Sequence, residues 1–134
     1  MAETVIIVEN DLGFAFWLGH TLDGAGYNAL PAVSVAAANS LVAELGIAVD
    51  LVVINACVAD AASFISNLRA ARPACRVIAL VDNPDDPPAS SPYADLVEHR
   101  PAYIDAGSQA DWLDTVRMVL SPGAFGFGIS STPL

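Results

Sequence analysis

The chain has 134 residues, about the length of one domain, which is long enough to bury a hydrophobic core without disulfides or metals. Hydrophobic residues make up 54% of the chain and charged residues 15%, a composition that excludes an intrinsically disordered protein. The chain contains fifteen acidic residues, five arginines and no lysine. The resulting net charge of −10 argues against binding to nucleic acid or to an anionic membrane surface.

The N-terminal segment lacks the features of a secretion signal or a membrane span. Its apolar run, Val5–Val8, lies between Glu3 and Glu9 and falls far short of the roughly 20 residues that a spanning helix needs. Two cysteines are too few for a disulfide scaffold. We therefore expect a cytoplasmic protein in which Cys57 and Cys75 are reduced thiols.

Short β-rich runs alternate with longer segments of helical periodicity, which is typical of an α/β fold. The expected strands are Thr4–Val8, Tyr27–Ala32, Asp50–Asn55, Arg76–Val81 and the weaker Ala94–Val97. The expected helices begin at Asn10 or Asp11, at Ser34, at Asp60 or Ser63, and at Ser108 or Asp111, and they end near Gly26, Gly46, Pro73 and Ser121.

Two segments are expected to be irregular. Asp82–Pro92 carries four prolines, which remove backbone donors and block the helical region for the preceding residue, so we expect a loop or a single turn. Residues 122–134 are rich in glycine and serine and are too short for a second domain. The sequence thus predicts one domain over residues 1–121 followed by a flexible tail over residues 122–134.

Five strands joined by right-handed helical crossovers predict a doubly wound parallel sheet with its site at the carboxyl ends of the strands. The residues expected at this rim are Glu9, Asn10, Asn55, Val81, Asp82 and those near Arg100.

The order and spacing of these residues resemble the receiver domain of two-component response regulators, the chemotaxis-regulator-like family. Residues 5–55 match its pattern without gaps: an acidic pair after the first strand, Gly26-Tyr27 before the second, and Asp50-Leu-Val leading to the phospho-acceptor position. The match continues more loosely to the last helix. It implies a flavodoxin-like sheet of strand order 2-1-3-4-5. The prolines of Asp82–Pro92 predict that the family's fourth helix is missing or reduced to a loop.

The residues that perform the family's chemistry are replaced. The phospho-acceptor aspartate corresponds to Asn55, whose neutral amide is too weak a nucleophile to form an acyl phosphate. The acidic pair that helps to hold magnesium corresponds to Glu9 and Asn10, which leaves one carboxylate of the family's three. Asp11 is a candidate to compensate in part. We expect a degenerate phosphorylation site with no catalytic residues, metal or cofactor.

The switch positions implied by the resemblance have changed as well. The family's Ser or Thr at the end of the fourth strand corresponds to Val81, and the aromatic switch residue corresponds to Val97. The lysine before a proline, which is cis in the family, corresponds to Arg100 followed by Pro101. Arg100 is either a permanent internal cation at the acidic pocket or a solvent-exposed arginine beside a turn.

Two features are candidates for an interaction surface. Phe16 falls on the outer side of the first helix, where it is either an anchor for a partner or a single exposed apolar residue. Asp85 and Asp86 in the proline-rich segment either recognise a basic partner or simply solvate the loop.

The favoured function is an atypical receiver-like domain of a bacterial two-component or phosphorelay system. It would act through protein–protein interaction, in signalling or transcription control, without aspartate phosphorylation and without enzyme activity; homodimerisation is an open alternative. Two further hypotheses remain: a flavodoxin-like domain that binds a small molecule or nucleotide, and the receiver module of a longer transcription regulator. The first lacks a glycine-rich phosphate motif, because Gly24-Ala-Gly26 ends a helix instead of beginning one.

Overall fold

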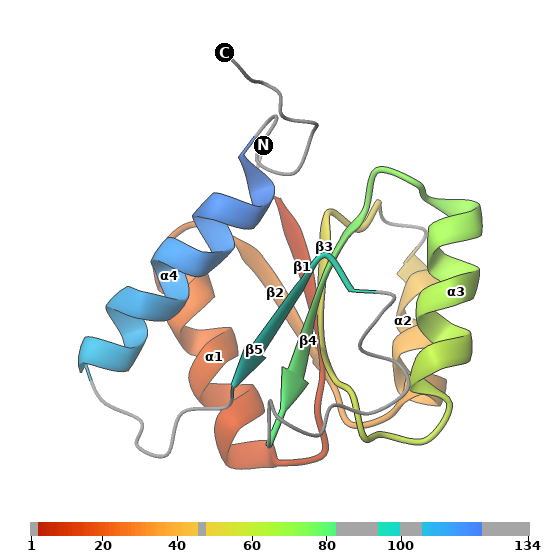
Figure 1. The fold of residues 1–134 in the computed structure, drawn as a ribbon, viewed down its shortest axis with the longest axis horizontal. Coiled ribbons are helices and arrows are strands. Elements are labelled where there is room, and N and C mark those ends of the chain that lie inside the picture. The colour runs from red at the N-terminus through yellow and green to blue at the C-terminus, as the bar shows by residue number, and fades with distance from the viewer. Residues whose placement is uncertain (1–2, 46–47, 83–93, 100–105, 122–134) are drawn as a thin grey trace.

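The structure is a computed structural model that describes residues 3–45, 48–82, 94–99 and 106–121. These residues form a five-stranded parallel sheet with the order β2-β1-β3-β4-β5 (Figure 1). The strands are β1 (Thr4–Val8), β2 (Asn28–Ala32), β3 (Leu51–Asn55), β4 (Arg76–Val81) and β5 (Leu96–His99). The predicted fold class and strand order are confirmed.

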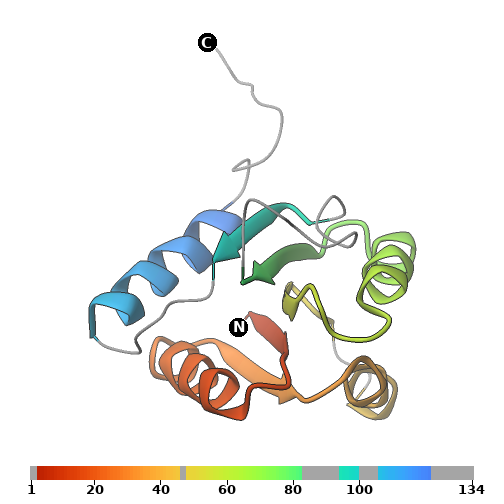
Figure 2. The same cartoon turned by 60° about the horizontal axis from the view of Figure 1, so that its bottom comes forward.

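Helices cover both faces of the sheet (Figure 2). One face carries α1 (Leu12–Gly24) and α4 (Ala106–Leu120), and the other carries α2 (Val35–Leu45) and α3 (Ala61–Ala71). The two-residue alternation of a strand explains how one sheet supplies two cores. In β1, Val5 and Ile7 pack in the α1–α4 core, whereas Ile6 and Val8 pack in the α2–α3 core.

The central strands are buried along their whole length. Every residue of β1 and of β3 is buried, as is typical of central strands in a parallel sheet that is covered on both faces. Because the two strands are parallel neighbours, with Val8 paired to Ile54, the residues at their carboxyl ends meet at one rim of the sheet. This arrangement brings Glu9 beside Asn55.

Helix starts follow the predicted capping residues in two cases. The Asp11 carboxylate accepts a hydrogen bond from the Phe14 backbone nitrogen at 3.2 Å, and the Ser34 hydroxyl accepts one from the Ala37 nitrogen at 3.1 Å. Asp60 precedes α3 as predicted, but its φ is 66° and its side chain forms no capping hydrogen bond with a described residue. The start of α3 is therefore set by packing and not by a side-chain cap.

Two predicted boundaries are wrong. The fifth strand is Leu96–His99 and not Ala94–Val97, because Asp95 folds its carboxylate back onto the Val77 nitrogen at 2.8 Å just before the strand begins. The last helix starts at Ala106, ahead of both Ser108 and Asp111. Helix packing overrides their capping preference, since Asp111 is exposed and Ser108 half-buried on the helix surface.

The two segments predicted to be irregular, Asp82–Pro92 and the tail, fall almost entirely on residues 83–93 and 122–134, outside the described residues. The loss of the family's fourth helix and the domain boundary at residue 121 therefore stay predictions. Among the helices of the described ranges, none has both the length and the hydrophobicity to cross a membrane.

Candidate functional site

The site predicted at the carboxyl end of the sheet is built around a buried hydrogen bond between β1 and β3. Glu9 directly follows β1 and is fully buried, and Asn55, the last residue of β3, is 7% exposed. The Asn55 side-chain nitrogen donates to Glu9 Oε2 at 2.9 Å. Because the pair is shielded from water, this hydrogen bond is electrostatically stronger than an ordinary surface one.

The other end of the Asn55 amide is also used. Its Oδ1 accepts a hydrogen bond from the Cys57 backbone nitrogen at 2.9 Å, in the turn that leads toward α3. The amide therefore donates to Glu9 and accepts from the turn at once. An ionised aspartate at position 55 would only accept, so it would face the Glu9 carboxylate without a proton to share.

The two residues that follow Glu9 add no second carboxylate to this pocket. The Asp11 backbone nitrogen donates to Glu9 Oε2 at 3.2 Å, while its own carboxylate caps α1 at the Phe14 nitrogen. Asn10 is exposed. A chain of hydrogen bonds thus runs from the turn after β3, through Asn55 and Glu9, to the first turn of α1.

This donor set is poor for a hard divalent cation, which prefers several anionic oxygens. Nowhere in the described part of the chain do three or more His, Cys, Asp or Glu side chains gather in a way that would hold a metal ion. Glu9 is the buried carboxylate of the pocket, and its Oε2 already accepts two hydrogen bonds. Asn55, which the resemblance places at the phospho-acceptor position, carries a neutral amide in place of a carboxylate.

The neighbouring end of β4 is apolar. Val81 is 1% exposed and packs with Ala56 and Ala79 in a small cluster beside the rim. A valine offers no hydroxyl to an incoming anion, so this side of the site lacks the hydrogen-bonding group that the resemblance implies. The next residue, Asp82, is exposed.

The remaining predicted switch residues divide into two sets. Val97 lies on β5, opposite Ala79 of β4, and is 40% exposed. Arg100 and Pro101 lie outside the described residues, as do Asp85 and Asp86. The role predicted for Arg100 at the acidic pocket and the cis form of Pro101 therefore stay predictions.

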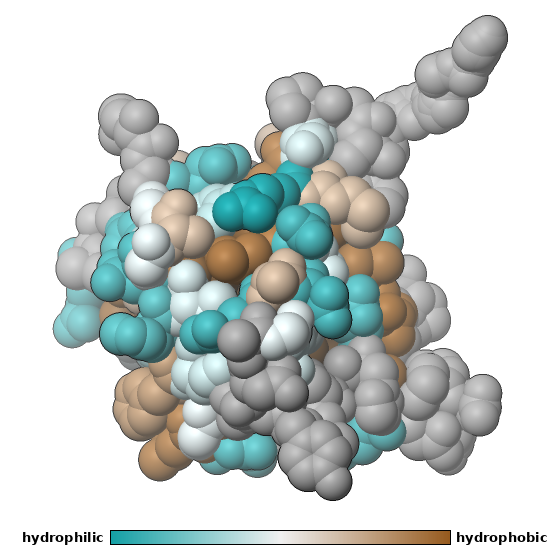
Figure 3. Space-filling model, turned by 90° about the vertical axis from the view of Figure 1, so that its left-hand side faces the viewer, coloured by the Kyte–Doolittle hydropathy of each residue, from teal (hydrophilic) through white to brown (hydrophobic). Residues whose placement is uncertain are grey.

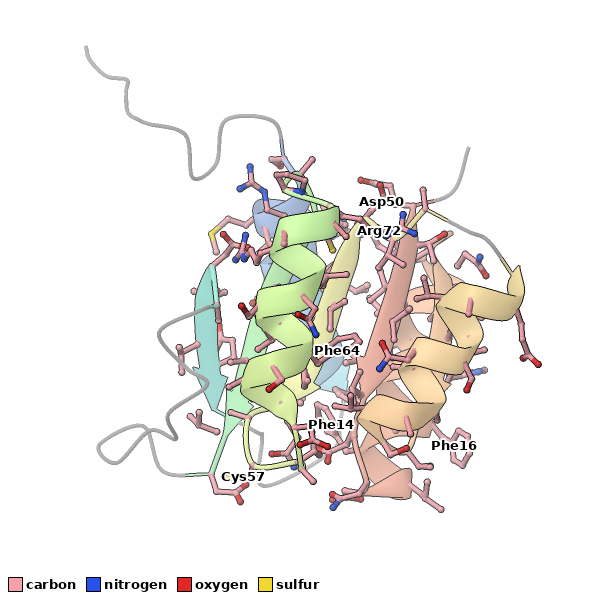
Figure 4. The ribbon with its side chains drawn as sticks, turned by 90° about the vertical axis from the view of Figure 1, so that its right-hand side faces the viewer. Phe14, Phe16, Asp50, Cys57, Phe64 and Arg72 are labelled. Atoms are coloured by element: carbon pink, nitrogen blue, oxygen red, sulfur yellow. The ribbon has the colours of Figure 1, made fainter. Side chains whose placement is uncertain are left out.

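Phe16 is exposed, as the helical spacing predicted. Its side chain is 60% exposed and points away from the sheet (Figure 4). Sequence analysis missed two other exposed apolar residues of this region, Leu12 at 48% and Val33 at 53%. The four-residue step from Leu12 to Phe16 could have predicted that both lie on the same side of the helix. No sequence pattern could have predicted the exposure of Val33, because it follows β2 and its exposure depends on how α1 lies across that strand.

An ion pair at the opposite end of the sheet was also missed. Arg69 of α3 and Asp95 before β5 meet at 2.8 Å, and Asp95 Oδ2 accepts from the Val77 nitrogen at 2.8 Å. Arg69 and Asp95 are 26 residues apart, so no local pattern pointed to the pair. These contacts of Asp95 hold the start of β5 against α3 and β4.

The two thiols differ in environment. Both cysteines are free; Cys57 is exposed near the rim, whereas Cys75 is buried just before β4. Burial, with Asp50 and Asp95 assisting and Arg69 and Arg72 opposing, raises the pKa of Cys75 to about 11. Cys75 is therefore a protonated, unreactive thiol at neutral pH.

Comparisons with known proteins find similar folds among solved structures. No protein-family model matches the chain, and no curated protein matches it. Solved structures do match. A CheY-like response regulator receiver domain from Methanospirillum hungatei is similar at a TM-score of 0.73 and 15% identity, over 90% of this chain and 94% of that one. The signal receiver domain of an HD-domain-containing protein from Pseudomonas fluorescens gives 0.72 and 19%, over 89% and 87%.

A third similar structure is a response regulator protein from Burkholderia pseudomallei with a phosphorylated aspartic acid and a calcium ion. It gives a TM-score of 0.68 and 17% identity, over 91% of this chain and 68% of that one. At these identities the similarity establishes the fold, which is that of CheY-like receiver domains.

Proposed function

We propose that this chain is a receiver-like signalling domain that works through protein–protein contact and does not accept a phosphoryl group at position 55. We place it in a bacterial two-component or phosphorelay system, in the cytoplasm and without enzyme activity. The receiver-domain fold supports the coarse assignment to response-regulator-like signalling. The residues at the rim support the departure from phosphorylation.

The observation that carries the proposal is the bonding of Asn55. Its nitrogen donates to the buried carboxylate of Glu9, and its oxygen accepts from the Cys57 backbone. Phosphoryl transfer needs an anionic oxygen at this point, with a cation to neutralise the added charge. An amide that is committed on both sides to hydrogen bonds supplies neither requirement.

The neighbouring positions support the same conclusion. Asn10 is exposed and uncharged, and Val81, at the position where the resemblance implies a Ser or Thr, has no hydroxyl to donate to a phosphoryl oxygen. The fold itself does not prevent phosphorylation, since the similar protein from Burkholderia pseudomallei contains a phosphorylated aspartic acid. The difference must therefore arise from the side chains of this chain.

The test is intact mass after incubation with acetyl phosphate and magnesium. The native chain is run beside Asn55→Asp, and a receiver domain known to be phosphorylated serves as the positive control. Asn67→Asp makes the same change of charge at an exposed position of α3 and controls for non-specific effects. We expect no adduct on the native chain or on Asn67→Asp.

The outcomes separate the contributions of the rim residues. An adduct on Asn55→Asp alone would assign the loss to the side chain at position 55. An unmodified Asn55→Asp would show that Asn10 and Val81 also prevent transfer. A hydroxylamine-labile gain of about 80 Da on the native chain would contradict the proposal, because another carboxylate such as Asp11 would then be the acceptor.

A further inference from the structure

An apolar surface lies along the β2 edge of the sheet, near the rim. A Cβ atom on Gly19 of α1 would lie 3.5 Å from Cγ of Pro31, so α1 crosses β2 at this point. Because α1 runs away from the rim and β2 runs toward it, Phe16 and Val33 both lie on the rim side of that crossing. Leu12 is one further turn of α1 toward the rim.

We call Leu12, Phe16, Pro31 and Val33 the β2-edge surface. All four side chains are exposed, three of them by roughly half or more. Hydrophobic residues gather at the lower left of the view in Figure 3, beside hydrophilic neighbours. Grouped exposed apolar side chains, unlike isolated ones, are typical of interaction sites.

The charged residues on the two elements that form the surface, α1 with its cap and β2, are all acidic. The first 68 residues of the chain contain seven acidic residues and no lysine or arginine. Asp11 adjoins Leu12, and Asp23 is eleven residues, or about three turns, further along the same side of α1. A partner with basic residues beside its apolar ones would match this combination, whereas an acidic partner would be repelled.

The backbone of β2 does not favour an added strand. The Asn28 nitrogen donates to Glu3 of the neighbouring chain segment, and the Ala32 oxygen accepts from Glu9, so these two residues face β1. By alternation, Pro31 faces the outer edge, where it has no N–H to offer. A helix laid on the side-chain surface fits better than a strand paired to the edge.

We propose that the β2-edge surface binds a cationic amphipathic helix of a partner protein, with its apolar ridge on Leu12 and Phe16 and its basic side chains toward Asp11 and Asp23. This proposal rests on the proposed function in giving that protein contact a location and a chemistry. A second copy of this chain is disfavoured as the occupant, since each copy carries a net charge of −10.

The test uses a synthetic fluorescent helix with leucine on one face and lysine on the other, long enough to span the three turns of α1. Binding to the unphosphorylated full chain is measured by anisotropy at physiological salt, and the contact residues are mapped by backbone amide chemical shifts. The comparison variant is the double change Leu12→Ser and Phe16→Ser. Met118→Ser on α4, at 47% exposure, is the matched control.

We expect the double variant to weaken binding at least about tenfold, because it removes the apolar anchors, and Met118→Ser to leave it unchanged. Shift changes should concentrate on α1 and the end of β2, and the same peptide with glutamate in place of lysine should not bind. Circular dichroism and the melting temperature check that the variants fold.

Three results would overturn the assignment: absence of binding by the native chain, equal binding by the double variant, or shift changes confined to β5 and α4. Sedimentation of the native chain as a dimer that Phe16→Ser dissociates would give the surface to a second copy instead. None of these results depends on phosphorylation. An adduct on the native chain would contradict the proposed function and leave the binding measurement intact.

Discussion

At position 55 an amide and a carboxylate of nearly the same shape have opposite consequences. The amide nitrogen donates to the buried Glu9 carboxylate at 2.9 Å, so the pair holds the ends of β1 and β3 together through its own side chains. An aspartate would place two carboxylates in contact and would need a cation or a shared proton to hold them. With Asn55 at this position, the ends of β1 and β3 are held together without a cation between two carboxylates.

A second residue, Cys75, makes the free energy of unfolding decrease as the pH rises through the alkaline range. Burial raises its pKa from 9.0 to about 11, so the folded state holds the proton more tightly than the unfolded state. The stabilisation is complete below pH 9 and is lost as the pH rises through 11. Between these values the native chain should lose about 2 kcal/mol more unfolding free energy than Cys75→Ala.

Urea unfolding at several pH values checks this expectation. Cys75→Ala leaves Tyr27, whose pKa is also raised by burial, in place, so the difference between the two proteins isolates the thiol. Parallel pH curves for both proteins would contradict a buried, protonated Cys75.

At the scale of elements, the end of α1 depends on one backbone conformation. Gly26 has a φ of 96°, and its nitrogen donates to the Asp23 oxygen at 3.1 Å as the chain turns toward β2. Gly24, the last residue of α1, is not in that region. A Cβ on either glycine would have no described atom within 4 Å, so the two positions differ in conformation and not in available space.

This pair gives a matched test of helix termination. Gly26→Ala should lower the free energy of unfolding by about 1–2 kcal/mol, because an alanine is strained at positive φ. Gly24→Ala should leave stability unchanged or raise it by up to about 1 kcal/mol, because alanine favours the helix. Chemical denaturation of both variants distinguishes the two effects. Equal losses would show that packing, and not φ, governs this turn.

At the scale of the whole molecule, Asp95 ties together three elements that are distant in sequence. Its carboxylate meets Arg69 of α3 at 2.8 Å and accepts from the Val77 nitrogen of β4 at 2.8 Å, immediately before β5. The Asp95 nitrogen also donates to the Val77 oxygen. This side chain therefore holds the edge strand β5 to the rest of the sheet.

Removing that carboxylate should be costly. Asp95→Ala should lower the unfolding free energy by about 2 kcal/mol, since it leaves the largely buried Val77 nitrogen without its acceptor and removes the ion pair with Arg69. Asp114→Ala removes the exposed ion pair with Arg117, at 3.4 Å, and should cost less than about 0.5 kcal/mol. Thermal or urea unfolding measures both. A small effect at Asp95 would mean that β5 is held by its backbone pairing alone.

The molecule also presents its two candidate functional features on one side of the rim. The hydrogen-bond chain from Cys57 through Asn55 and Glu9 ends in the first turn of α1, where Asp11 caps the Phe14 nitrogen. The β2-edge surface begins on the same turn with Leu12. The rim of this chain therefore positions the start of the helix that we propose contacts a partner.

Much of the fold could be predicted from the sequence because its signals are local. Strand-sized apolar runs, the caps at Asp11 and Ser34, and the alternation of strand and helix predicted the parallel sheet, and the structure confirms it. The weak nucleophilicity of the side chain at position 55 could also be predicted, because an amide is a weaker nucleophile than a carboxylate in any surroundings. The start of β5 was misplaced, because Asp95 acts through partners on α3 and β4.

The sequence alone determined that position 55 has no carboxylate and position 81 no hydroxyl, since the residue type decides whether a side chain can be an anion, a nucleophile or a hydroxyl donor. Only the tertiary structure decided how the remaining groups are used. The Asn55–Glu9 bond joins residues 46 positions apart, and the close approach of Gly19 to Pro31 sets where α1 crosses β2. Such contacts arise from packing between elements, which leaves no periodic trace along the chain.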